Sequence, residues 1–308
     1  MLAIVLVMAT AQPAAAATKP AQVKPMSIVA ASTTSLTLKW SAVSKATNYE
    51  VYYATNYGMA KAIKKKVGKR TSYRVAGLAK GRTYCFQIRA VRGKTTGKKS
   101  NRTCKPTIVA QGATTGAPVR IMTYNICSTK PGCQASWNWA TRRPHAAALI
   151  EAYQPDVVAL QESERGDGID SELAGYITMD QAGERYAVWA ELKDTTNDHR
   201  FIFVSVHTAA GKSYTYDAPR KVFNGQGYYD AYDLAATLTR PNYNSYNAFT
   251  TTPAFSKRWG DHVDHVWVKP STQVRHWQGV VRLNGSKLAT PIPSDHNPVK
   301  VDLTIPLS

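Results

Sequence analysis

The sequence has almost no acidic residues in its first third. Residues 19–105 hold 20 lysines and arginines and a single acid, Glu50, whereas the rest of the chain holds 19 basic and 19 acidic residues. The whole excess behind the formal net charge of +19 therefore lies in this first part. So sharp a change in charge indicates two domains with different tasks, and a chain of 308 residues is long enough for them.

The sequence also lacks an apolar run long enough to cross a membrane. Residues 2–9 are apolar, but crossing a bilayer takes about 20 such residues. Small residues follow them, which predicts a signal peptide over residues 1–17 with cleavage near Ala15 to Ala17. The usual positive charge before the apolar run is missing, so we expect the true start further upstream. We expect a secreted, extracellular, monomeric protein without a transmembrane segment.

Cysteine is scarce, and no C-x-x-C motif or nearby histidine pair accompanies it, which argues against a zinc site. The four cysteines are Cys85, Cys104, Cys127 and Cys133. An even number in an exported chain predicts disulfide bonds. Pairing within domains gives Cys85–Cys104 and Cys127–Cys133.

Residues 20–107 alternate apolar and polar positions with the period of β-strands. The inward faces predicted by this alternation are Leu36, Leu38 and Trp40; Tyr49, Val51 and Tyr53; and Tyr84, Phe86, Ile88 and Ala90. Several short strands with such spacing indicate an all-β sandwich. The strand with Trp40, and Leu78 followed by Tyr84, resemble the second strand and the tyrosine corner of fibronectin type III domains. That family supplies spacer or binding modules, so the resemblance implies no chemistry.

The basic residues of this domain gather in two stretches, residues 61–70 and 94–105. Charged runs are usually just solvated surface. Twenty bases with one acid, however, make a surface that attracts polyanions. We therefore expect this domain to tether the protein to nucleic acid, another polyanion or an anionic cell envelope. The small, uncharged residues 108–118 are predicted to be the linker.

Residues 119–308 mix strands with helices, which predicts an α+β or layered-sandwich domain. A helix is expected over residues 142–153, with an apolar stripe of Ala146, Leu149, Ile150 and Tyr153, and it should end at Gln154-Pro155. Strands are expected over residues 119–125, 156–162, 186–192, 201–207, 262–268 and 298–305. The aromatic and basic stretch 137–144 suits a nucleotide or sugar, but packing of Trp139 under the helix is the preferred interpretation.

Polar side chains recur where these strands end or inside them. They are Asn125, Glu162, His207, Asp264, Asp295 and His296. Each alone has an ordinary structural explanation, such as a turn or a solvated acid. Together, in this order, they suggest catalytic groups held on rigid elements.

The order resembles the endonuclease/exonuclease/phosphatase superfamily, which includes deoxyribonuclease I and bacterial sphingomyelinases. The matching segments are MTYN, VVALQES, VSVHT, WGDHVDHVWV and PSDHNPV. The resemblance implies a four-layer α+β sandwich and cleavage of phosphodiesters with a divalent metal, usually Mg²⁺, with Mn²⁺ or Ca²⁺ as alternatives. A hard cation with oxygen ligands would neutralise the charge of such a substrate.

The resemblance also implies a role for each residue. Glu162 matches the metal-binding acid, with Asp295 supporting the metal side. Asn125 matches a residue that helps to hold metal or phosphate. His296 matches the general base with Asp264 as its orienting partner, and His207 matches the histidine at the phosphate.

On a strand through residues 262–265, His262 and Asp264 would share one face, and Val263 and His265 the other. We therefore place Asp264 at the site and interpret His262 and His265 as structural.

The family's G-D-x-N motif is missing between His207 and Asp261. The chain is abruptly short there, which predicts an absent central strand and exposed hydrogen-bonding edges on its neighbours. Asp217 and Asn224 are nearest in position to the motif, but their spacing is wrong. Either the chain is impaired by this loss or another residue substitutes for the motif. The sequence therefore predicts a secreted phosphodiesterase, foremost a nuclease, whose activity depends on which of the two holds. The alternatives are a phospholipid phosphodiesterase resembling sphingomyelinases and an inactive protein that binds polyanions or the envelope.

Overall fold

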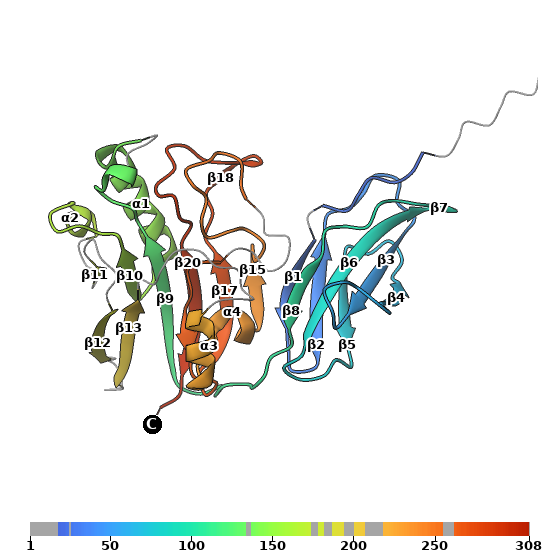
Figure 1. Ribbon diagram of the computed structural model, residues 1–308, viewed down its shortest axis with the longest axis horizontal. Helices are drawn as coiled ribbons and strands as arrows, with labels where there is room; N and C mark the ends of the chain where they lie inside the picture. The colour runs from blue at the N-terminus through green and yellow to red at the C-terminus, as the bar shows by residue number, and fades with distance from the viewer. Residues whose placement is uncertain are drawn as a thin grey trace, which may run out of the picture.

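The computed structural model describes residues 18–24, 26–133, 137–173, 178–181, 187–193, 200–206, 218–254 and 262–307. The predicted signal peptide, His207 and Asp217 lie outside this part of the chain. Figure 1 shows two bodies side by side, an N-terminal one built of strands and a C-terminal one with a larger sheet and helices. We call them the N-terminal domain, residues 18–107, and the C-terminal domain, residues 117–307.

The N-terminal domain is a sandwich of two sheets, as its alternating pattern predicts. One sheet contains β1 (Met26–Ala31), β2 (Ser35–Trp40) and β5 (Ser72–Ala76). The other contains β3 (Asn48–Ala54), β4 (Ile63–Lys66), β6 (Thr83–Arg92), β7 (Thr95–Thr96) and β8 (Thr103–Pro106). The core between them is filled by the predicted inward faces, including Leu36, Leu38, Tyr49, Phe86 and Ile88.

Two local features of this domain confirm the sequence interpretation. The hydroxyl oxygen of Tyr84 accepts a hydrogen bond from the backbone N–H of Ala79 at 2.9 Å, which is the geometry of a tyrosine corner. The disulfide Cys85–Cys104 joins neighbouring positions of the paired strands β6 and β8.

The C-terminal domain is built on a mixed sheet. Its order is β11 (Thr178–Gln181), β10 (Val157–Gln161), β9 (Ala117–Asn125), β20 (Val299–Ile305), β17 (Gln273–Gly279) and β15 (Thr237–Thr239). The central strands β9 and β10 run parallel, and every residue of β10 is buried. Such continuous apolar runs are expected where a sheet is covered on both faces.

Helix α1 (Trp139–Tyr153) covers one face of this sheet (Figure 1). It begins three residues before the predicted start because Asn138 caps it, its Oδ1 accepting from the backbone N–H of Thr141 at 2.9 Å. It ends at Gln154, as predicted, where the backbone turns left-handed with φ of 42°. Ala146 and Ile150 pack into the core below it. Two shorter helical turns lie nearby, η1 (Pro131–Cys133) and α2 (Ile169–Glu172).

The opposite face of the sheet packs around Trp277 and is covered by short elements. They are β12 (Ala187–Lys193), β13 (Arg200–Val206), α3 (Ala218–Gly225), β14 (Tyr229–Asp230), α4 (Ala231–Leu234) and β16 (Trp267–Val268); β18 (Leu283–Asn284) and β19 (Lys287–Leu288) form a separate hairpin. The expected four-layer sandwich would contain a second sheet packed on the first. Within the described residues, only two separate strand pairs, β12–β13 and β14–β16, stand in its place.

The sheets of the two domains are continuous. Strand β1 of the N-terminal domain pairs antiparallel with β15 of the C-terminal domain, with Ala30 opposite Thr237. The backbone N–H of Ala31 donates to the carbonyl of Ala236 at 2.9 Å. Among the described residues, nine strands thus share one sheet, from β11 to β5 (Figure 1). The sequence predicted exposed edges beside an absent central strand but did not predict β15, whose outer edge the N-terminal domain covers.

The linker is packed against both domains. Ile108 is buried in the core of the C-terminal domain, and the backbone N–H of Ala113 donates to the carbonyl of Ser271 at 2.9 Å. A Cβ added to Gly112 would lie 2.3 Å from the carbonyl carbon of Thr272, so only glycine fits there. The joint is therefore a close contact, not a flexible tether.

Lys105 of β8 adds a buried polar contact to the joint. Its side chain is fully buried, and Nζ donates to the carbonyls of Tyr232 at 2.7 Å and Asp233 at 3.1 Å. Burial lowers the pKa of Lys105 to about 8, although Asp233 and Asp230 oppose the shift. In the described part of the chain, none of the helices has the length and apolar character needed to cross a membrane.

Candidate active site

The predicted site residues of strands β9 and β10 lie at one edge of the sheet. Asn125 is the last residue of β9, and Glu162 directly follows β10. The two strands are parallel, with Gln161 opposite Asn125, so both end at the same edge, the upper one in Figure 1. Ser294 joins a third segment to this edge, its Oγ donating to the carbonyl of Asn125 at 2.6 Å. The neighbours Asp295 and His296 are thereby placed beside the strand ends.

His296 and Asp264 form a buried hydrogen-bonded pair. Nδ1 of His296 lies 2.9 Å from Oδ2 of Asp264, and both side chains are largely buried. Burial alone would raise the pKa of Asp264, but the charge and hydrogen bond of His296 lower it below its ordinary value. Burial alone would lower the pKa of His296, but Asp264, Asp295 and Glu162 raise it to about 9. The carboxylate holds the proton on Nδ1 and leaves Nε2 for chemistry.

Two further carboxylates, Asp295 and Glu162, gather around this pair. Burial raises the pKa of Asp295 above its ordinary value; His296 opposes the shift, and the nearby charge of Glu162 adds to it. Nζ of Lys130 lies 4.0 Å from Oε2 of Glu162 and supplies part of the neutralising charge. Glu162 and Asp295 are near enough for their charges to interact, and carboxylate oxygens are the ligands that a hard divalent cation prefers, so the residue types present fit a Mg²⁺-type ion.

Asn125 is oriented by its own loop. Its Oδ1 accepts a hydrogen bond from the backbone N–H of Cys127 at 3.0 Å. The side-chain nitrogen Nδ2 is then the group that Asn125 can offer to a ligand, and an amide nitrogen is a donor suited to a phosphate oxygen.

Arg142 holds the loops of the site together. Its side chain is fully buried below the loops that follow β9 and precede β20. The guanidinium donates to backbone carbonyls of both loops, namely those of Ile126, Cys127, Ser128, Cys133 and Pro293, at 2.6–3.2 Å, and Nε donates to Trp137. Only arginine supplies five donors in one rigid plane.

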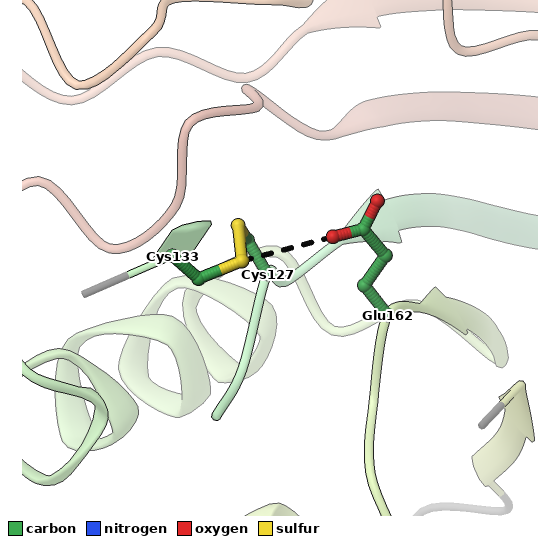
Figure 2. A group of neighbouring side chains, drawn as sticks. All are labelled: Cys127, Cys133 and Glu162. Carbon is green, nitrogen blue, oxygen red and sulfur yellow. Dashed lines mark hydrogen bonds between the residues drawn. A yellow bond between two sulfur atoms is a disulfide. The ribbon is translucent and has the colours of Figure 1, made fainter. Parts of the chain in front are cut away.

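The disulfide Cys127–Cys133 lies beside Glu162 (Figure 2). Sγ of Cys133 is 3.7 Å from Oε2 of Glu162, the approach marked by the dashed line. The two sulfurs and the carboxylate lie within 4.8 Å of one another, a spacing that would suit a metal ion. Because both sulfurs are oxidised, they are neither thiolate ligands nor hydrogen-bond donors, so this group is a brace for the loop next to Glu162.

The predicted strand through residues 262–268 was wrong in its first part. Only Trp267 and Val268 form a strand, β16. Upstream, Oγ of Ser245 accepts the backbone N–H groups of Val263 at 2.9 Å and Asp264 at 3.2 Å, so these donors are taken by a loop instead of a sheet. The argument from alternating faces therefore fails, although Asp264 does meet His296.

The two neighbouring histidines lie apart from His296. Nδ1 of His265 is 2.8 Å from Oδ2 of the buried Asp230. His262 packs against the rings of Tyr232 and Trp277, and burial lowers its pKa to about 4. Among the described residues, Nε2 of His262 has no hydrogen-bond partner.

The loop that carries Tyr246 was not predicted from the sequence to lie at the site. The ring of Tyr246 meets that of His296 edge-on at 5.2 Å, yet 47% of the residue is exposed. Asn247 anchors the loop through its Nδ2, which donates to the carbonyl of Ser294 at 3.0 Å. The only sequence signal was a run of asparagine and tyrosine after Pro241, which resembles an ordinary loop.

Other predicted candidates lie elsewhere. Trp139 packs under α1, and its Nε1 donates to the carbonyl of Asp167 at 2.7 Å, as the preferred interpretation had it. Asn224 is exposed on α3. His207 and Asp217 lie outside the described residues.

Comparison with known proteins identifies the N-terminal domain. Residues 21–104 match the family model of the fibronectin type III domain, so the chain contains such a domain. The curated proteins give no match.

Solved structures show only a weak overall likeness. The FN1–FN3 domains of chicken CNTN1 are 18% identical with a TM-score of 0.27, covering 28% of this chain and 31% of that one. A two-domain fibronectin type III segment of chicken tenascin is 20% identical with a TM-score of 0.27, covering 29% and 51%. The chain thus spans less than two thirds of either structure. The third fibronectin III domain of human KIAA0343 protein is 18% identical with a TM-score of 0.28, covering 36% and 100%. Scores this low support no inference about function.

Proposed function

We propose that the chain is an exported, divalent-metal-dependent phosphodiesterase of the endonuclease/exonuclease/phosphatase type, acting foremost as a nuclease. The observation that carries the proposal is the meeting of three segments remote in sequence: Glu162 and Asp295 lie near the hydrogen-bonded pair of Asp264 and His296. An ordinary structural histidine has no need of three carboxylates around it.

Each residue has a task in this reaction. Nε2 of His296, with Asp264 orienting the ring, would take the proton of the attacking water. Nδ2 of Asn125 would hold a phosphate oxygen. Glu162 and Asp295 would hold the cation, which when bound neutralises the phosphate charge and weakens the field that keeps His296 protonated. The exposed ring of Tyr246 would flank the substrate beside His296.

A second candidate, a polyanion-binding protein without catalysis, is favoured by one observation. No aspartate between residues 208 and 261 is followed two positions later by asparagine, so the motif that contacts water and phosphate in the resembled family is missing. In that case the basic N-terminal domain would supply the main function, attachment to nucleic acid or to an anionic envelope.

Hydrolysis assays separate these functions. The full-length protein is incubated with bis(p-nitrophenyl) phosphate, supercoiled plasmid or sphingomyelin, in Mg²⁺, Mn²⁺ or EDTA. We expect metal-dependent cleavage of the first two, lost in His296→Ala and kept in the control His145→Ala, which alters a histidine of α1. Phosphocholine release from sphingomyelin alone would assign the phospholipid alternative. If no substrate is hydrolysed with any of the metals, the polyanion-binding protein without catalysis is the candidate function that remains.

A further inference from the structure

The fibronectin type III domain carries a surface pocket of about 210 Å³, which shares no lining residue with the candidate active site. It is lined by polar and basic side chains: Gln22, Tyr57, Gln87 and residues 98–102. Gln87 lies on β6 between the inward-facing Phe86 and Ile88, so the pocket opens on the outer face of the sheet.

Aromatic rings hold two cations at this pocket. Nζ of Lys99 lies 4.1 Å from the ring centre of Tyr52, and the guanidinium of Arg102 lies 4.5 Å from that of Tyr57. Arg102 also donates to the carbonyl of Tyr57 at 2.7 Å. A charge already fixed in place loses little freedom when a ligand binds, so these two groups are preorganised.

The loop that carries these cations is itself fastened to the sheet. Nε2 of Gln22 donates to the carbonyl of Lys99 at 2.6 Å. Nε2 of Gln87 donates to the carbonyl of Ser100 at 2.9 Å. The pocket is therefore a built feature and not a chance gap between mobile lysines.

Among the residues that the structure describes, the positive charge of the pocket is not compensated. In the described part of the chain, Lys98, Lys99 and Arg102 form no ion pair. The domain's one acid, Glu50, is already engaged by Arg89 at 2.6 Å and Lys64 at 3.4 Å. A polar pocket with unpaired cations is suited to an anion.

The charge extends beyond the pocket in a row across the sheet. Tyr52 of β3 lies opposite Lys64 of β4 on one side and Gln87 of β6 on the other. Neighbouring strands are about 4.8 Å apart, so the row from Lys64 to Gln87 spans roughly 10 Å before it reaches the pocket. Strand β4 is exposed along its whole length, and Lys66, two residues from Lys64, lies on the same face as Lys64. Lys64 and Lys66 add positive charge to this face, with Lys64 paired to Glu50 at 3.4 Å, and an extended positive face attracts a polymer that carries negative charges.

We propose that this face, the pocket at Lys98, Lys99 and Arg102 together with the row through Tyr52 to Lys64, binds the phosphodiester backbone of single-stranded nucleic acid. The choice of nucleic acid rests on the proposed function, because a phosphodiesterase gains from a second site that raises the local concentration of its own substrate. Planar guanidinium and aromatic groups at one site also suit phosphates and bases together.

Fluorescence anisotropy with a labelled single-stranded oligonucleotide tests the proposal on the full-length protein. Binding is measured in EDTA at several salt concentrations, so that cleavage plays no part. The double variant Lys99→Gln/Arg102→Gln is compared with Lys39→Gln/Lys80→Gln, which removes the same charge from exposed positions outside this face. Thermal unfolding verifies that both variants fold.

We expect the pocket variant to bind at least about tenfold more weakly and to reduce the slope of log K against log salt by about 1.4, as loss of two phosphate contacts predicts. The control should change affinity less than threefold. Equal weakening in both variants would overturn the proposal, because it would mean diffuse attraction. Preferential binding of heparin, with the same loss in the pocket variant, would overturn the choice of nucleic acid. A protein that binds in EDTA but hydrolyses nothing with metal refutes only the proposed function.

Discussion

His296 and Asp264 lie 32 residues apart in the chain, and their side chains meet at 2.9 Å. No secondary structure joins them, because Asp264 lies in a loop held by Ser245 and His296 lies in a loop anchored by Ser294. The pair is therefore a product of tertiary packing.

Removing the carboxylate of this pair should abolish hydrolysis without unfolding the protein. Asp264→Asn keeps the size of the side chain but no longer stabilises positively charged His296. We expect kcat for bis(p-nitrophenyl) phosphate to fall at least about 100-fold. Asp156→Asn, at a partly exposed ion pair with Arg120, is the control and should keep full activity. Normal turnover by Asp264→Asn would refute the assigned role.

Arg142 should be one of the most sensitive positions for stability. Arg142→Met leaves the carbonyls that it binds buried without a donor, and we expect a loss of about 3 kcal/mol or more in the free energy of unfolding. The neighbouring Arg143 forms a half-exposed ion pair with Glu172, so Arg143→Met should cost about 1 kcal/mol at most. Urea denaturation measures both. Equal costs would show that the buried carbonyls find other partners.

The two disulfides should differ in their effect on function. Removing Cys127–Cys133, six residues apart, by a double change to serine should cost about 2 kcal/mol. Removing Cys85–Cys104, 19 residues apart, should cost about 3 kcal/mol. Only the first should lower hydrolysis, because it frees the loop whose Ser128 donates to the carbonyl of Glu162 at 2.9 Å. Loss of activity in the second variant alone would contradict this.

His262 should make the protein sensitive to acid. Burial lowers its folded-state pKa from 6.5 to about 4, so between these values the unfolded chain binds the extra proton. Its contribution to stability is thus complete above pH 6.5 and is lost as the pH falls toward 4, by about 3 kcal/mol. His262→Phe should flatten the fall in unfolding free energy over this range. An unchanged slope would mean that other groups control it.

Lys105 should contribute to the joint between the domains. Lys105→Ala removes the donor for the carbonyls of Tyr232 and Asp233 and leaves a cavity, so we expect unfolding to become easier by about 3 kcal/mol. The exposed Lys80, changed to alanine, should shift stability by less than about 0.5 kcal/mol. If the two variants unfold at the same temperature, the buried contact of Lys105 does not contribute to the stability of the protein.

The features that could be predicted from the sequence depend on neighbours along the chain. The alternation through Leu36, Leu38 and Trp40 predicted a buried strand face. The resemblance of Leu78 followed by Tyr84 to a tyrosine corner implied a hydrogen bond between the Tyr84 hydroxyl and nearby backbone, and the partner is Ala79. Helix α1 followed from its apolar stripe and its end at Gln154.

The features that could not be predicted depend on contacts between distant segments. The hydroxyl of Ser245, remote in sequence, accepts the backbone N–H groups that the expected strand at Asp264 would have used. The pairing of Ala30 with Thr237 left no local trace either, because any edge strand offers the same backbone groups.

The shared sheet has a consequence for how a long ligand would engage the protein. Since β1 and β15 pair and the linker is packed, the fibronectin type III domain cannot swing freely, and the separation between its basic face and His296 is fixed. A nucleic-acid strand that contacts the basic face and His296 at the same time must have a minimum length set by that separation. The protein would then bind and cleave long nucleic-acid strands well and fragments shorter than this span poorly.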